Sequence, residues 1–155
     1  MRVSHVVIVA MMLIPALVSM GLMISYAGQY HDIIERMDKV STLSPLVKDA
    51  LINELFSVVA GRKKFEEGTQ FETLAAVNGQ LDALLSRNPA SKDELTVARR
   101  TMNTLTDHVY RLGDQMREGS TVEENEALLE DVRDVSALVV EMLQDSITAE
   151  IDAAT

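Results

Sequence analysis

The chain has 155 residues, enough for one domain, and contains no Cys and no Trp. The absence of cysteine excludes disulfide scaffolds, thiolate-ligated zinc and thiol nucleophiles, and the low counts of 7 Gly and 3 Pro argue against sandwiches, barrels and disordered linkers. The formal net charge of -10 excludes a general nucleic-acid binder, so we expect no nucleic-acid partner.

The first predicted element is an apolar helix over residues 6–24, a run of 19 residues without a charge. This length is close to the ~20 residues that cross a bilayer, and Arg2 before the run favours export of the remainder. A cleaved signal peptide is the main alternative, because Ser25-Tyr26-Ala27 before Gly28 suits a cleavage site. We favour the uncleaved anchor because the run exceeds the usual signal core of about 7 to 15 residues. A buried core helix is a third interpretation.

Four amphipathic helices are predicted after this segment, over about residues 29–60, 70–87, 92–118 and 122–152. Three of them begin with an S/T-x-x-E capping box, in which the hydroxyl and the Glu each bond a free N–H of the first turn. The boxes are residues 69–72, 91–94 and 121–124. In the first helix, Ser44-Pro45 either caps a start, with Pro45 at the first helical position, or marks a kink.

Apolar residues spaced alternately three and four apart run along residues 95–116, which is the pattern of a helix in a bundle or coiled coil. We predict that this seam packs the bundle or a homodimer; its residues include Met102, Leu105, Val109, Leu112 and Met116. The last helix has a similar apolar stripe with a second row of aliphatic residues beside it, called its flank, and we expect both to be buried. The flank consists of Leu129, Leu138, Leu143, Ile147 and Ile151. The predicted fold is therefore all-α: a membrane or signal helix (residues 1–27), then an up-down four-helix bundle (residues 28–155).

All of the net charge lies in residues 118–155, which hold eleven acids and one base, Arg133 (1 − 11 = -10). Residues 1–117 hold 13 acids and 13 bases. We interpret the acidic run mainly as the solvated face of the last helix. The alternative is a surface for a basic partner protein.

Residues with the spacing of a catalytic, metal or cofactor site are not found, so we expect neither an enzyme nor a bound cofactor. His5, His31 and His108 have no partner at metal spacing. A cationic group at the end of the 45–60 helix has two interpretations. It complements the helix dipole, or it forms an anion-binding corner with cations of a later helix. The residues of this corner would be Arg62, Lys63, Lys64, Arg99 and Arg100.

An apolar anchor followed by an exported four-helix bundle resembles the sensor domains of bacterial chemoreceptors and histidine kinases, closest to the nitrate- and nitrite-sensing type. That family carries an L-x-x-E-L-Q-x-E-R-G helix followed by F-x-x-x-L. Leu51, Glu54 and Leu55 match the helix, which is followed here by Phe71, Leu74 and Leu81-Asp82. The resemblance covers only the first half of that domain, and the anion-binding Arg motif falls on Val58-Val59-Ala60.

The resemblance implies a dimeric module in the periplasm, or otherwise outside, of a single-pass bacterial inner-membrane receptor, which transmits a signal by helix displacement. A small anionic ligand would be its stimulus. The first alternative is a stand-alone anchored or secreted helical protein that binds a partner protein, because the chain ends without a second membrane helix or output domain. An enzyme or metal-storage bundle is disfavoured because Glu-x-x-His pairs are absent.

Overall fold

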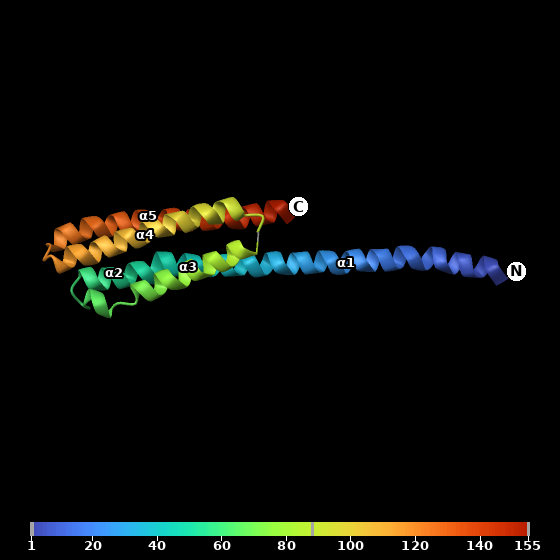
Figure 1. Ribbon diagram of the computed structural model, residues 1–155, viewed down its shortest axis with the longest axis horizontal. Coiled ribbons are helices and arrows are strands. Elements are labelled where there is room, and N and C mark those ends of the chain that lie inside the picture. The colour runs from blue at the N-terminus through green and yellow to red at the C-terminus, as the bar shows by residue number, and fades with distance from the viewer. Residues whose placement is uncertain (1, 88, 155) are drawn as a thin grey trace. The chain divides into compact units, whose positions relative to one another are not determined.

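The protein is described from a computed structural model, which covers the backbone of residues 2–87 and 89–154, and the side chains of residues 15, 17–87 and 89–154. Within these residues every regular element is a helix, which confirms the all-α prediction (Figure 1). In chain order they are α1 (Arg2–Pro45), the π-helix η1 (Leu46–Leu51), α2 (Ile52–Val59), the 3-10 turn η2 (Phe65–Glu67), α3 (Gln70–Ser86), α4 (Lys92–Arg117) and α5 (Val122–Ala154).

The chain divides into two compact units, residues 1–35 and 36–155. Residues 2–35 of the first unit all belong to α1, which continues through Gly28 without a break. The predicted membrane span, residues 6–24, lies partly outside the described side chains, at residues 6–14 and 16, and so does His5. Among the residues that the structure describes, no helix combines the length and the apolar character that a membrane crossing requires.

The second unit is a four-helix bundle in which successive helices alternate in direction (Figure 1). Its first helix, called the first arm below, is residues 36–59 and joins the end of α1, η1 and α2. The other three are α3, α4 and α5. Their bounds agree with the predicted ranges within two residues, because periodicity and turn residues set them locally.

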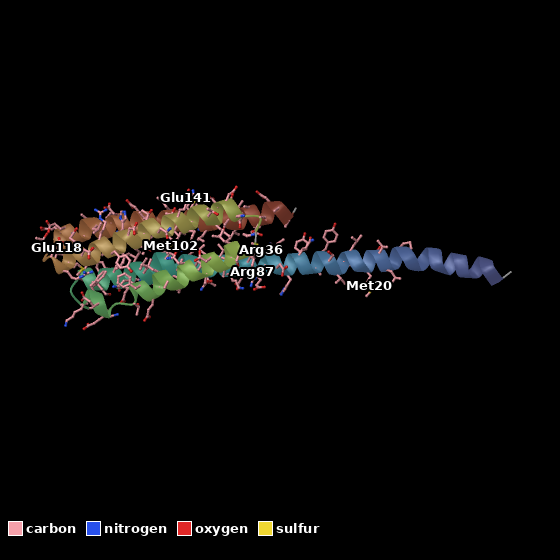
Figure 2. All side chains as sticks on the ribbon, in the orientation of Figure 1. Met20, Arg36, Arg87, Met102, Glu118 and Glu141 are labelled. Carbon is pink, nitrogen blue, oxygen red and sulfur yellow. The ribbon has the colours of Figure 1, made fainter. Side chains whose placement is uncertain are left out.

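The predicted seam of α4 lies in the core of this bundle. Met102, Leu105, Val109 and Leu112 are fully buried, and Met116 is half-buried (Met102 is labelled in Figure 2). These four side chains of the seam therefore pack within one chain, inside the bundle.

The predicted flank of α5 is wrong at two positions. Leu138 is 50% exposed and Ile151 is 45% exposed. Leu129 and Leu143 of this flank are buried as predicted, and the buried stripe of α5 also includes Ser136, Ser146 and Glu150. An aliphatic composition favours burial of the whole flank. Packing against α4 buries only a narrower stripe of α5, however, and Leu138 and Ile151 lie outside it.

The π-helix η1 follows Pro45 and keeps four core residues on one side of the first arm. Leu43, Val47, Leu51 and Leu55 are fully buried and spaced four apart. In an α-helix, each step of four residues turns the side chain by about 40°, so three steps would turn it by about 120°. A π turn holds more residues, because its hydrogen bonds span five, and it corrects this drift. Of the two interpretations of Pro45, the interior position in a longer helix is the one observed.

Gly113 of α4 gives the ring of Phe65 its place in the core. Phe65 is 5% exposed, and a Cβ added at Gly113 would lie 2.2 Å from the Cε1 atom of that ring. The same ring contacts Phe71 edge-on, at 5.6 Å between centroids. The loop that follows α2 is therefore fixed against the last third of α4.

We expect Gly113→Ala to destabilise the bundle by about 1–3 kcal/mol, because overpacking outweighs the gain of about 1 kcal/mol in helix propensity. Gly79→Ala in α3 is the matched control, since nothing lies within 4 Å of its added Cβ. That variant should gain up to about 1 kcal/mol. Urea unfolding followed by far-ultraviolet circular dichroism measures both. Equal stability of the two variants would contradict the close contact.

Candidate functional site

Each cation of the Arg62–Lys64 group has a different neighbour. The Lys63 Nζ atom lies 2.6 Å from the Glu54 Oε1 atom. The Arg62 guanidinium lies 5.9 Å from the centre of the Phe56 ring, a cation–π distance. The Lys64 side chain is 80% exposed and lies 4.0 Å from Glu67. One of the three charges is thus neutralised within the chain by a short ion pair.

Arg99 and Arg100 lie at the opposite end of α4 from this group. The Arg99 Nε atom donates to the Asp82 Oδ1 atom of α3 at 2.8 Å, and Arg100 is exposed. Phe65, directly after Lys64, packs at Gly113, which is 14 residues from Arg99 (113 − 99), or about 21 Å along the helix. The structure does not bring the five predicted cations together into one anion-binding corner.

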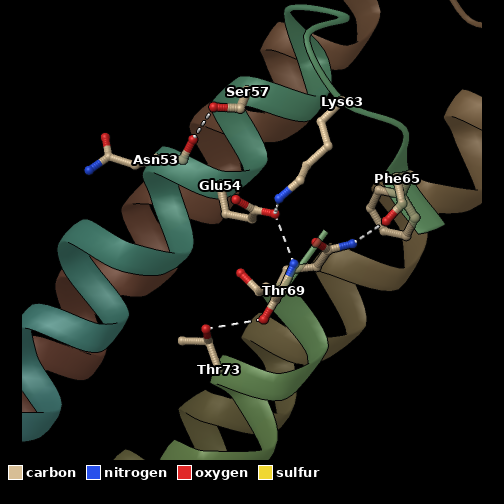
Figure 3. Close-up of polar contacts among 8 residues, drawn as sticks. Asn53, Glu54, Ser57, Lys63, Phe65, Thr69 and Thr73 are labelled. Carbon is tan, nitrogen blue, oxygen red and sulfur yellow. Dashed lines mark hydrogen bonds and ion pairs between the residues drawn. The ribbon is translucent and has the colours of Figure 1, made fainter. Parts of the chain in front are cut away.

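Glu54 caps α3 from another helix (Figure 3). Its Oε1 atom accepts the backbone N–H of Thr69 at 2.8 Å in addition to the Lys63 ammonium. The bond from Lys63 and the Thr69 N–H hold the pKa of the Glu54 carboxyl below its usual range. In the predicted capping box Glu72 would bond Thr69; a residue on α2 bonds it instead. Glu54 therefore has a structural role, like the buried Leu51 and Leu55 beside it.

Glu150 holds the start of α4 in a second, more buried cluster. Its side chain is 3% exposed. One carboxylate oxygen accepts the Ser91 N–H at 3.0 Å and the Ser91 hydroxyl at 2.8 Å. The other accepts Arg36 Nη2 at 2.8 Å and Nε at 3.1 Å. Burial raises the pKa of Glu150, but the bonds from Ser91 and Arg36 prevail and leave it below its usual range. The cluster joins the first arm, α4 and α5.

Of the three predicted capping boxes, only the third forms as predicted. The Glu124 Oε2 atom accepts the Thr121 N–H at 2.8 Å, and the Thr121 hydroxyl accepts the Glu124 N–H at 3.3 Å. In the box that begins at Ser91, the hydroxyl donates to Glu150. A signal for this was present, because Glu150 continues the buried spacing of Leu143 and Ser146.

A groove, called the acidic groove below, lies between the first arm and α5. It consists of two adjoining hollows of about 610 and 430 Å³, which share Ile52, Glu130 and Arg133. Volumes in this range are typical of ligand-binding clefts. Its lining residues are Lys48, Asp49, Ile52, Asn53, Phe56, Glu126, Leu129, Glu130, Arg133, Asp134, Ser136, Ala137, Val140, Glu141 and Gln144.

Sequence reasoning did not predict the acidic groove. The acids of α5 were interpreted mainly as a solvated face, with a surface for a basic partner protein as the alternative. The groove appears only where that face meets η1 and α2. Lys48 and Asp49 belong to η1, so an occupant would touch the π turn directly.

Comparisons with models of known protein families, with curated proteins and with solved structures gave no match to this chain. The contacts themselves define the class of protein: an all-α chain whose second unit is a four-helix bundle, with an acidic groove between its first and last helices.

Proposed function

We propose that this chain is an extracytoplasmic sensory module of a bacterial transmembrane signalling receptor, anchored in the inner membrane through residues 6–24. An occupant of the acidic groove would displace the first arm, and α1 would carry this displacement to the membrane. The observation that carries the proposal is the continuity of α1, which includes both the apolar segment and the start of the first arm.

The side chains of the first unit support the anchor. Its described residues expose large apolar groups at nearly every position between residues 17 and 24, each by more than half. At 100° per residue these positions surround the helix on all sides, and such a surface favours an apolar environment. The residues are Leu17, Val18, Met20, Leu22, Met23 and Ile24.

The position of the π turn supports helix displacement. Single π turns occur frequently at functional sites, because they depart from the regular α-helical hydrogen bonding. Here the turn both borders the groove and keeps Val47 and Leu51 in the core. A change from π to α geometry in η1 would alter the register of the residues that precede it. The homodimer stays a prediction, and it would use surfaces other than the α4 seam.

The length and charge of the acidic groove favour a second candidate, a stand-alone anchored or secreted protein that binds a partner protein. It shares the export and the groove with the first proposal and differs in requiring no helix displacement. The two proposals are separated by whether groove binding moves the first arm relative to α5.

Single-cysteine labelling tests the anchor, since the native chain contains no Cys. Asn103→Cys lies at an exposed position of α4, and Ser4→Cys lies before the apolar run. In intact spheroplasts, a membrane-impermeant maleimide should label N103C and should label S4C only after lysis. The protein should also remain with the membrane fraction after a carbonate wash. Labelling of both variants only after lysis would overturn the proposed export.

A further inference from the structure

We infer that the acidic groove binds a basic amphipathic helix of a partner protein. The inference rests on the proposed function only in using the same groove, and it specifies the chemistry of the occupant. It follows from the length, the charge and the apolar floor of the groove.

The groove is long enough for a helix. Its two hollows adjoin one another, because Ile52, Glu130 and Arg133 line both of them. Along α5 it extends from Glu126 to Gln144, a difference of 18 residues (144 − 126), or about 27 Å. A small organic cation would fill only part of this length, whereas a helix of about five turns matches it.

The charge of the groove calls for a cationic partner. Five carboxylates and two cations line it, so the formal charge of its lining is 2 − 5 = -3. One of the cations, Arg133, already donates to Glu130 at 2.9 Å. The carboxylates are Asp49, Glu126, Glu130, Asp134 and Glu141. A second copy carries a net charge of -10, and this overall charge opposes its approach to the groove.

The groove also has apolar side chains that an amphipathic helix would cover, and one buried hydroxyl. The Phe56 ring is 52% exposed at one side of the groove, and Ile52 and Val140 are only partly buried. Aliphatic residues repeated at three- and four-residue spacing on a helix could cover these side chains while flanking lysines meet the acids. Ser136 lines the groove, is 2% exposed, and its hydroxyl has no hydrogen-bond partner among the described residues.

The test uses the full chain in phosphatidylcholine nanodiscs and a fluorescent 18-residue peptide with leucines on one face and lysines on the other. Empty nanodiscs correct for binding to lipid. The groove variant is Asp134→Lys with Glu141→Lys. The matched control is Asp131→Lys with Asp145→Lys, which changes the charge equally on the same helix at exposed positions outside the groove lining.

We expect saturable binding to the native chain, binding at least about tenfold weaker to the groove variant, and a change of less than about threefold in the control. Phe56→Ala should weaken binding too, and a peptide with glutamates in place of lysines should not bind. No binding to the native chain, or equal loss in both charge variants, would overturn the inference. Displacement of the peptide by spermidine, but not by NaCl of equal ionic strength, would overturn it in favour of a small polyamine. Self-association of the native chain that the groove variant abolishes would overturn it in favour of a second copy.

A distance measurement in the same nanodiscs separates this inference from the proposed function. Spin labels at Ala50→Cys in η1 and Asp131→Cys in α5, two exposed positions, measure the distance between the first arm and α5. A shift of the distance distribution on peptide binding supports both statements. Binding without a shift supports the docking inference and contradicts signalling by helix displacement.

Discussion

Glu150→Ala is expected to destabilise the bundle by about 3 kcal/mol or more, the largest effect of any exchange of an acid in α5. The substitution leaves the Arg36 guanidinium without its carboxylate and removes the acceptor of both Ser91 donors. The side chain of Arg36 is only 18% exposed, so water replaces the lost partner poorly. Urea unfolding followed by circular dichroism measures the change, in the same detergent for every variant.

Glu141→Ala is the matched control, because Glu141 lies exposed on the same helix (Figure 2). It should change the free energy of unfolding by less than about 0.5 kcal/mol. Glu150→Gln should lie between the two alanine variants, since the amide keeps the shape and an acceptor oxygen but not the charge. A loss in E150A no larger than that in E141A would contradict the role of the cluster.

The pH dependence of unfolding gives an independent check of the same cluster. Because the pKa of Glu150 in the folded chain is below its ordinary value of 4.5, its stabilisation is complete above about pH 4.5 and is lost as the pH falls through the folded-state pKa. E150Q should therefore lose less stability in acid than the native chain. Part of the acid loss should remain, because the pKa of Glu54 is lowered as well.

Leu105→Ala is the second substitution with a large expected effect, about 2–5 kcal/mol. Leu105 is fully buried in the core, so its removal costs the transfer free energy of the side chain and leaves a cavity. Leu138→Ala in α5 is the matched control with the same chemical change at a site that is 50% exposed. It should cost less than about 1 kcal/mol.

The comparison of the two leucines also tests where the α4 seam packs. If the seam packs within one chain, the midpoint of unfolding of the native chain is independent of protein concentration, and L105A lowers it equally at every concentration. A midpoint that rises with concentration in the native chain and not in L105A would show that the seam holds two chains together.

The bounds of α3, α4 and α5 were predictable because the determining interactions are local. The three-and-four spacing through Met102 and Leu105 and the breaker before each helix act within a few residues of the chain. The capping box at Thr121 formed as predicted for the same reason, since all its partners lie within four residues.

The candidate site was largely not predictable. Arg62 begins a run of three basic residues, and Arg99 begins a run of two. The distance between the two runs depends on where the loop after α2 packs on α4, which is at Gly113. The acidic groove likewise depends on which face of α5 packs against η1. The π turn sets the direction of the η1 side chains, and Lys48 and Asp49 of this turn line the groove.

By itself the sequence determined an all-α chain, the bounds of α3, α4 and α5, the buried seam of α4 and an acidic last helix. The predicted start of the first bundle helix at residue 29 was wrong, because α1 continues without a break from Arg2 to Pro45. The tertiary structure decided which carboxylates are solvated and which hold the fold together. Ser91 and Glu150 are 59 residues apart in the chain, so their bond exists only once α4 and α5 have packed. Helical hydrogen bonds span about four residues and follow from local pattern, whereas a cap supplied by a distant helix requires the whole bundle.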